Sequence, residues 1–93
     1  MNVSVKFFAQ LRDLTGKKTK IEFDLDEGAT ISHLLDALFL DSRIKKHMLD
    51  ENDQINSDIT ILRNGREIKF LQGTDTILNS GDEISIFPLV VGG

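Results

Sequence analysis

Apolar and polar side chains alternate along the first residues of the chain, from Asn2 to Phe8. A period of two is typical of a strand that buries one face, and here it leaves Phe8 on the polar side. Residues 18–25 alternate more regularly and end at a turn over 26–28. The two segments predict an antiparallel hairpin whose connection, 9–15, is a broad turn with some helical character.

A helical period replaces the alternation after Thr30, which is a suitable N-cap residue. Apolar residues then recur at intervals of three and four, as in an amphipathic helix over 31–40. They are Ile31, Leu34, Leu35 and Leu38. A second short helix is expected within 41–49, followed by a polar surface loop over 50–58.

Three further strands are predicted in the last third of the chain, over 59–63, 66–70 and 83–87. Asn64–Gly65 joins the first two as a tight hairpin, because both residues tolerate a positive φ. Alternation in the second of these strands places Phe70 on the inner face. This order of elements predicts an α+β fold of the ubiquitin-like β-grasp type, a mixed five-stranded sheet with one main helix packed on one face.

The composition fits one small domain of 93 residues, 40% hydrophobic and 28% charged, which we place at 1–87 with a tail over 88–93. A formal net charge of −4 makes nucleic acid an unsuitable partner. The absence of cysteine excludes disulfides, thiolate metal sites and thiol nucleophiles. No apolar run is long enough to span a membrane and no signal segment precedes the first strand, so we expect a cytoplasmic protein.

Catalytic and metal-binding motifs are missing from the body of the chain. His33 and His47 lie 14 residues apart without a third ligand at a suitable spacing, so neither a metal nor a bound cofactor is expected. We interpret His33 as a surface or first-turn residue and His47 as solvated. The serines lack any motif of an activated nucleophile. By elimination, the C-terminal tail is the unusual chemical feature.

The tail ends on two glycines, and the carboxylate of Gly93 is unhindered because glycine has no Cβ. The six residues after Phe87 extend about 20 Å, enough to enter another protein's active site. A carboxylate is a poor electrophile until an ATP-using enzyme adenylates it, after which a sulfur or amine nucleophile displaces AMP. The residues expected to insert with Gly93 are Pro88, Leu89, Val90, Val91 and Gly92. The alternative is a frayed end, against which the apolar residues of the tail argue.

A second candidate site is the face of the sheet that the helix leaves open. Alternation puts Phe8, Leu62 and Phe87 there, and the two rings lie close together if the first and last strands are neighbours. A cluster of exposed apolar residues indicates a partner-binding surface. Alternatively, one ring covers the sheet edge or packs under the loop at Leu11. Arg12, in the same loop, either orients an acidic partner or is simply solvated.

Five segments of the sequence form one pattern: Val5–Gly16, Asn64–Gly65, Gly81–Ile84, Phe87–Pro88 and Gly92–Gly93. This pattern resembles the MoaD family, the sulfur-carrier small subunits of molybdopterin synthase, which are related to ThiS and to the small archaeal modifier proteins. The resemblance spans essentially the whole chain, and a terminal Gly-Gly alone would be weak support for it.

The resemblance implies a cycle of three steps. A MoeB-like enzyme adenylates Gly93 with ATP, and a sulfurtransferase converts the adenylate to a thiocarboxylate. The tail then inserts into a MoaE-like large subunit, where sulfur is delivered to precursor Z to build the dithiolene of molybdopterin. Phe8, Arg12 and Phe87 match family positions at partner interfaces. The chain would thus be the sulfur-donating subunit of a transferase without a catalytic constellation of its own.

Two tail residues depart from the usual family pattern and leave the sulfur acceptor open: Leu89 replaces a common second proline, and Val91 replaces a small residue. One alternative is a ubiquitin-like modifier joined through Gly93 to lysines. Another is a sulfur carrier for thiamine synthesis or tRNA thiolation. A third is a binding module in which the sheet face matters and the tail does not.

Overall fold

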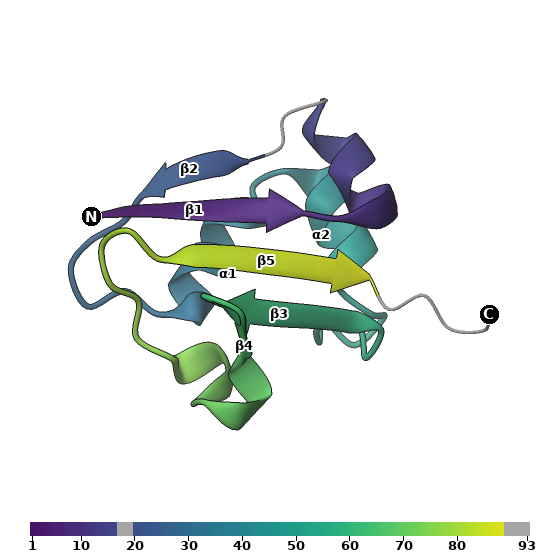
Figure 1. The fold of residues 1–93 in the computed structure, drawn as a ribbon. Helices are drawn as coiled ribbons and strands as arrows, with labels where there is room; N and C mark the ends of the chain where they lie inside the picture. The colour runs from purple at the N-terminus through teal and green to yellow at the C-terminus, as the bar shows by residue number, and fades with distance from the viewer. Residues whose placement is uncertain (17–19, 89–93) are drawn as a thin grey trace.

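The computed structural model describes residues 1–16 and 20–88 of the chain. Five strands form one sheet in the order β2-β1-β5-β3-β4, and two helices lie against the same face of it (Figure 1). The central strands, β1 (Asn2–Phe7) and β5 (Glu83–Pro88), are parallel, whereas the other neighbours are antiparallel. The predicted β-grasp architecture is confirmed, including the mixed sheet.

The first hairpin pairs β1 with β2 (Ile21–Asp24) in the register Val3↔Phe23. The predicted start of the second strand at residue 18 falls on 17–19, which lie outside the described residues. Between the two strands, Ala9–Thr15 forms a 3₁₀ helix, η1, which agrees with the predicted helical turn. Gly16 closes it at a φ of 64°, a left-handed conformation that glycine adopts without a Cβ clash.

The main helix, α1, runs from Ile31 to Leu38, two residues shorter than predicted. The apolar stripe ends at Leu38, and Leu40 is exposed in the connection to the next helix. The Thr30 N–H donates to Nδ1 of His33 at 2.9 Å, so His33 acts in the first turn of the helix. The expected second helix is α2, Ser42–Met48.

The second hairpin joins β3 (Ile59–Arg63) to β4 (Arg66–Glu67), with φ values of 48° and 84° at its two turn residues, Asn64 and Gly65. The prediction of a strand continuing to Phe70 with its ring inside was wrong. The chain instead enters a 3₁₀ helix, η2 (Ile68–Phe70), and the Phe70 side chain is 84% exposed. Residues i and i+2 share a face in a strand but not in a helix of three residues per turn, so burying Ile68 turns Phe70 outward.

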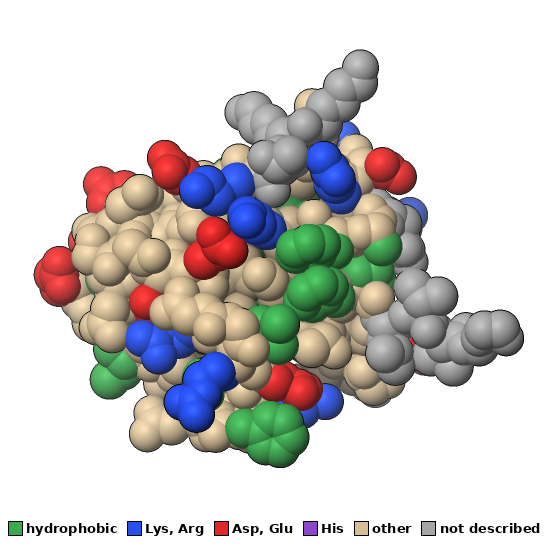
Figure 2. All heavy atoms as spheres, in the orientation of Figure 1, with side chains coloured by type: hydrophobic (Ala, Val, Ile, Leu, Met, Phe, Trp, Pro, Cys, Tyr) green, Lys and Arg blue, Asp and Glu red, His purple; other side chains and the backbone are tan. Residues whose placement is uncertain are grey.

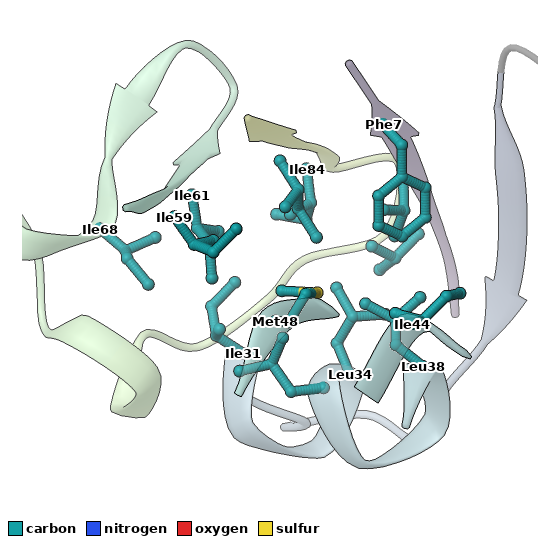
Figure 3. Packing of buried hydrophobic residues seen from close by; sticks show 14 of the residues in the cluster. Phe7, Ile31, Leu34, Leu38, Ile44, Met48, Ile59, Ile61, Ile68 and Ile84 are labelled. Atoms are coloured by element: carbon teal, nitrogen blue, oxygen red, sulfur yellow. The ribbon is translucent and has the colours of Figure 1, made fainter. Parts of the chain in front are cut away.

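The core lies between the sheet and the two helices (Figure 3). The inward-facing residues of the strands and the apolar stripe of α1 pack against each other there. Its main members are Val3, Val5, Phe7, Leu11, Ile31, Leu34, Leu38, Ile44, Met48, Ile61, Leu78, Ile84 and Ile86. Within residues 1–16 and 20–88, neither α1 nor α2 covers the opposite face of the sheet, where the candidate docking residues lie.

The buried carboxylate of Asp82 fixes the start of β5. It accepts hydrogen bonds from Arg63 Nε at 2.8 Å, from Asn64 Nδ2 at 2.9 Å and from the Asn79 N–H at 2.8 Å. Burial raises the pKa of Asp82, but these hydrogen bonds outweigh it and hold the pKa below its usual value. Asp82 thereby ties the tip of the β3–β4 hairpin to the turn before β5.

Candidate docking surface and C-terminal tail

Two phenylalanine rings stack on the open face of the sheet. The ring centroids of Phe8 and Phe87 are 4.4 Å apart and the ring planes differ by 18°. Their proximity follows from strand pairing, because Phe8 comes directly after β1 and its N–H donates to the Ile86 carbonyl at 3.1 Å. The expectation that the Phe8 and Phe87 rings lie close together is therefore confirmed. Leu11 is in the core, and Phe8 remains 37% exposed.

Leu62 lies at the rim of this pair. In the β3–β5 register, Phe87 is opposite Thr60 and Leu62 is opposite Ser85, so Leu62 is a diagonal neighbour of Phe87 on the same face. Diagonal neighbours are about 7–8 Å apart, within reach of an aromatic ring. Leu62 is half-buried. We call Phe8, Phe87 and Leu62 the sheet patch; Figure 2 shows a group of hydrophobic side chains on this face.

Positive charge flanks the sheet patch although the chain as a whole is acidic (Figure 2). Lys6, on β1, pairs with Glu83 at 3.4 Å. Arg12 projects from η1 as an exposed side chain, and within the described ranges no carboxylate lies at ion-pair distance from it. An exposed cation beside an apolar patch suits a partner surface with an acidic rim.

The tail begins where the sheet patch ends. β5 continues one residue beyond its predicted end, to Pro88, whose Cα is paired with that of Ile59. Pro88 is half-buried and is the last residue that the structure describes. The other predicted insertion residues lie outside the described residues: Leu89, Val90, Val91, Gly92 and Gly93. Pro88, the base of the tail, therefore directly follows Phe87 of the sheet patch within β5.

Other chemistry is sparse in the part of the chain that the structure describes. No three residues among its histidines and carboxylates are grouped so that they could hold a metal ion. Nδ1 of His47 donates to the Arg43 carbonyl at 2.8 Å, because a carbonyl oxygen only accepts. No described helix has the length and apolar character to cross a bilayer.

One apolar pocket was missed by sequence reasoning. It opens beside β3 and is lined in part by Ile55, Ile59, Ile61 and Ile68. The available signal was Ile55, the single apolar residue in the polar 50–58 loop. A lone apolar residue in a loop does not reveal which part of the fold it covers, so the pocket could not be located from the sequence.

The sequence that carries the sheet patch and the tail is similar to a known protein family. The ThiS family model matches residues 5–93. The chain belongs to the ThiS family. It is therefore a small ubiquitin-like protein of the ThiS/MoaD group of sulfur carriers and modifiers.

Two relatives match this ThiS-family chain over its full length and theirs. Small archaeal modifier protein 3 of Haloferax volcanii is 34% identical over 93 residues, covering 100% of both chains. The sulfur carrier protein CysO of Mycobacterium tuberculosis is 31% identical over 96 residues, again covering 100% of both. The family thus includes similar proteins named for modification and for sulfur carriage.

Solved structures agree with the fold. The crystal structure of SAMP1 from H. volcanii superposes with a TM-score of 0.86 at 28% identity, covering 100% of both chains. A Pyrococcus furiosus protein described as molybdopterin converting factor, subunit 1, superposes with a TM-score of 0.75 at 30% identity, covering 97% of this chain and 99% of its own. The resemblance to MoaD proteins therefore holds at the level of the wider ThiS/MoaD group.

Proposed function

We propose that this ThiS-family chain is a sulfur carrier and protein modifier whose reactive group is the Gly93 carboxylate. The observation that carries the proposal is the continuity of β5 with the tail: Phe87 of the sheet patch is followed by Pro88 and then by five residues ending in Gly92–Gly93. Full-length similarity to a small archaeal modifier and to a sulfur carrier supports both roles.

The chemistry needs a second protein for activation. A Gly93 carboxylate oxygen attacks the α-phosphorus of ATP, pyrophosphate leaves, and an acyl-adenylate forms. The terminal sulfur of a sulfurtransferase persulfide then displaces AMP to form an acyl disulfide, and a thiol cleaves that S–S bond to leave the thiocarboxylate and a new disulfide. Alternatively, a lysine amine attacks the adenylate, AMP leaves and an isopeptide forms. Positioning ATP and stabilising the developing charge require groups arranged around the phosphates, which an E1-like, MoeB-like activating enzyme would supply.

The sheet patch is the proposed docking surface for that enzyme. Stacked aromatic rings form a preorganised apolar anchor, and Arg12 adds a cation that an acidic rim on the enzyme would complement. Because the tail leaves the domain next to Phe87, an enzyme that holds the patch can take Gly93 into its active site within the reach of the tail. Docking and activation thus share one end of the sheet.

Replacing Phe87 by alanine is expected to weaken binding to the activating enzyme about tenfold, the usual loss for an aromatic anchor of moderate importance. The domain should stay folded, since Phe87 packs on the open face and not in the core. Phe70→Ala is the matched control, because Phe70 is equally aromatic, 84% exposed and outside the patch. Titration calorimetry with both variants measures the effect, and equal affinities for the two would refute the docking role.

A more specific candidate is the small subunit of molybdopterin synthase. The similarity to the P. furiosus protein and the MoaD-like pattern of residues favour it. The thiocarboxylate at Gly93 would then enter a MoaE-like large subunit and deliver sulfur to precursor Z. Thiamine synthesis and tRNA thiolation are the competing acceptors for the same thiocarboxylate.

Affinity purification from cells separates these destinations. A carrier for molybdopterin should co-purify with a large synthase subunit, and that complex should convert precursor Z when the chain carries the thiocarboxylate. A modifier should instead yield proteins whose lysines carry the Gly93 remnant. Recovery of lysine adducts without any thiocarboxylate would exclude the molybdopterin role.

A further inference from the structure

Two arginines face each other across the β3–β4 hairpin. Arg63 and Arg66 are directly paired, and residues opposite each other in antiparallel strands share a face with their Cβ atoms about 5 Å apart. Like charges at such positions destabilise the strand pair. Asp82 compensates Arg63 through a 2.8 Å contact with Nε. No described carboxylate lies at ion-pair distance from Arg66, so one positive charge of the pair is left uncompensated in the part of the chain that the structure describes.

A hollow of about 400 Å³ adjoins the arginine pair, and Arg63 lines it together with Leu71 and Ile77. The Arg63 side chain is 23% exposed. Among residues 1–16 and 20–88, only its Nε has a hydrogen-bond partner, the Asp82 carboxylate. The two Nη groups of Arg63 are therefore available as donors beside an apolar surface.

The exposed apolar residue of this hollow, Ile77, is held in place by its backbone. The Ile31 N–H donates to the Thr76 carbonyl at 3.0 Å, and the Leu78 N–H donates to the Ala29 carbonyl at 2.9 Å. Thr76 and Leu78 are both buried. Successive side chains of an extended segment point to opposite sides, so burial of both neighbours turns Ile77 outward, where it is 55% exposed.

We propose that this hollow binds an extended segment of a partner protein in which an aliphatic side chain stands next to a carboxylate. We call Arg63, Arg66, Leu71 and Ile77 the hairpin site. Charge complementarity selects the carboxylate, because a guanidinium donates two parallel hydrogen bonds to it. The fixed Ile77 side chain and the half-buried Leu71 offer an apolar contact to the aliphatic neighbour. The net charge of −4 makes a nucleic acid the less suitable anion.

The hairpin site lies away from the sheet patch. Alternation along β3 puts Leu62 on the open face and Arg63 on the other face. Arg63 is opposite Ile84, near the start of β5, and Phe87 lies three residues, about 10 Å, further along that strand (Figure 1). A short segment bound at the hairpin site therefore leaves the sheet patch uncovered, so a second protein can recognise the chain while the patch is occupied.

An NMR titration of the intact ¹⁵N-labelled chain with the capped peptide acetyl-Leu-Asp-Leu-Asp-amide tests the proposal. It needs no enzyme, so its outcome is independent of whether Gly93 is activated. The amide resonances of Leu71 and Ile77 should shift, whereas those of the sheet patch should not. Arg66→Gln should weaken binding about tenfold, the value of one charge-assisted hydrogen bond. Lys46→Gln is the matched control, because it removes the same charge from an exposed position on α2 and should bind the peptide unchanged.

The melting temperature separates a binding role of Arg66 from a structural one. Removing one of two like charges should leave the melting temperature of Arg66→Gln unchanged or slightly raised. Ile77→Ala shortens an exposed side chain and should weaken peptide binding in a chain that stays folded. A clear fall in the melting temperature of Arg66→Gln would show that this arginine supports the hairpin and would count against the proposal.

Four results of the titration would overturn the proposal. Amide resonances of the hairpin site that do not respond to millimolar peptide would show that no such segment binds there. Equal weakening by Arg66→Gln and Lys46→Gln would mean that the peptide responds only to net charge. Equal binding of acetyl-Gly-Asp-Gly-Asp-amide would leave the apolar side chains without a role. Tighter binding of oligothymidine at the same amides would assign the arginine pair to nucleic acid.

Discussion

Replacing Asp82 by alanine is expected to lower the free energy of unfolding by about 3 kcal/mol, the range for breaking a buried, hydrogen-bonded ion pair. Asp82 is only 6% exposed, and its carboxylate accepts hydrogen bonds from Arg63, Asn64 and the Asn79 N–H. The substitution leaves three donors without their acceptor, one of them a guanidinium. Urea denaturation measures the loss, and Asp36→Ala, an exposed helix carboxylate, is the control.

The hydrogen-bonded carboxylate of Asp82 also predicts how the free energy of unfolding depends on pH. The pKa of Asp82 is lower in the folded chain than in the unfolded chain, where aspartate titrates near 3.9. Its contribution is therefore fully present above about pH 4 and is lost as the pH falls through the folded-state pKa. The stability gap between the natural chain and Asp82→Ala should be largest at neutral pH and shrink in acid. A gap that is constant across this range would show that the charge of Asp82 is not what stabilises the turn.

Deleting Gly93 is expected to reduce adenylation of the chain by at least about 100-fold, because displacement of a reacting group by as little as 1 Å costs that much. The shortened chain still ends in a carboxylate, but one placed a full residue, about 3.5 Å, short of the reaction site. ATP–pyrophosphate exchange with the activating enzyme measures the effect.

The melting temperature of the shortened chain is the first control, because it shows whether the deletion disturbs the fold. The core and all five strands lie within residues 1–88, so the melting temperature should not change. Leu40→Ala, far from the tail in sequence and exposed, should retain full exchange activity. Normal exchange by the chain that lacks Gly93 would show that the terminal carboxylate need not lie at a fixed distance from the domain.

The sheet patch could be predicted because it depends on alternation and on the order of strands alone. Phe8 directly follows β1 and Phe87 is the second-last residue of β5, and the fold makes β1 and β5 parallel neighbours. Two strands running in the same direction bring such residues to the same end of the sheet. The pairing of the rings thus followed from local pattern and topology together.

Phe70 and the pocket could not be predicted, for one shared reason. The residues 66–70 fit a strand, and they also fit two strand residues followed by a 3₁₀ turn. Which one forms depends on how Ile68 packs against the rest of the core, a tertiary contact that local periodicity does not contain. The short β4 that results both exposes Phe70 and leaves the edge of β3 open.

Intact mass spectrometry of the chain isolated from cells tests the central claim most directly. We expect a fraction of molecules to carry the mass increase of one oxygen-to-sulfur exchange, located by fragmentation at Gly93, and this fraction should vanish in cells that lack the activating enzyme. Lysine-linked Gly93 would accompany it where the chain also acts as a modifier. A C-terminus that is always a plain carboxylate, with neither thiocarboxylate nor lysine adducts under any growth condition, would contradict the account.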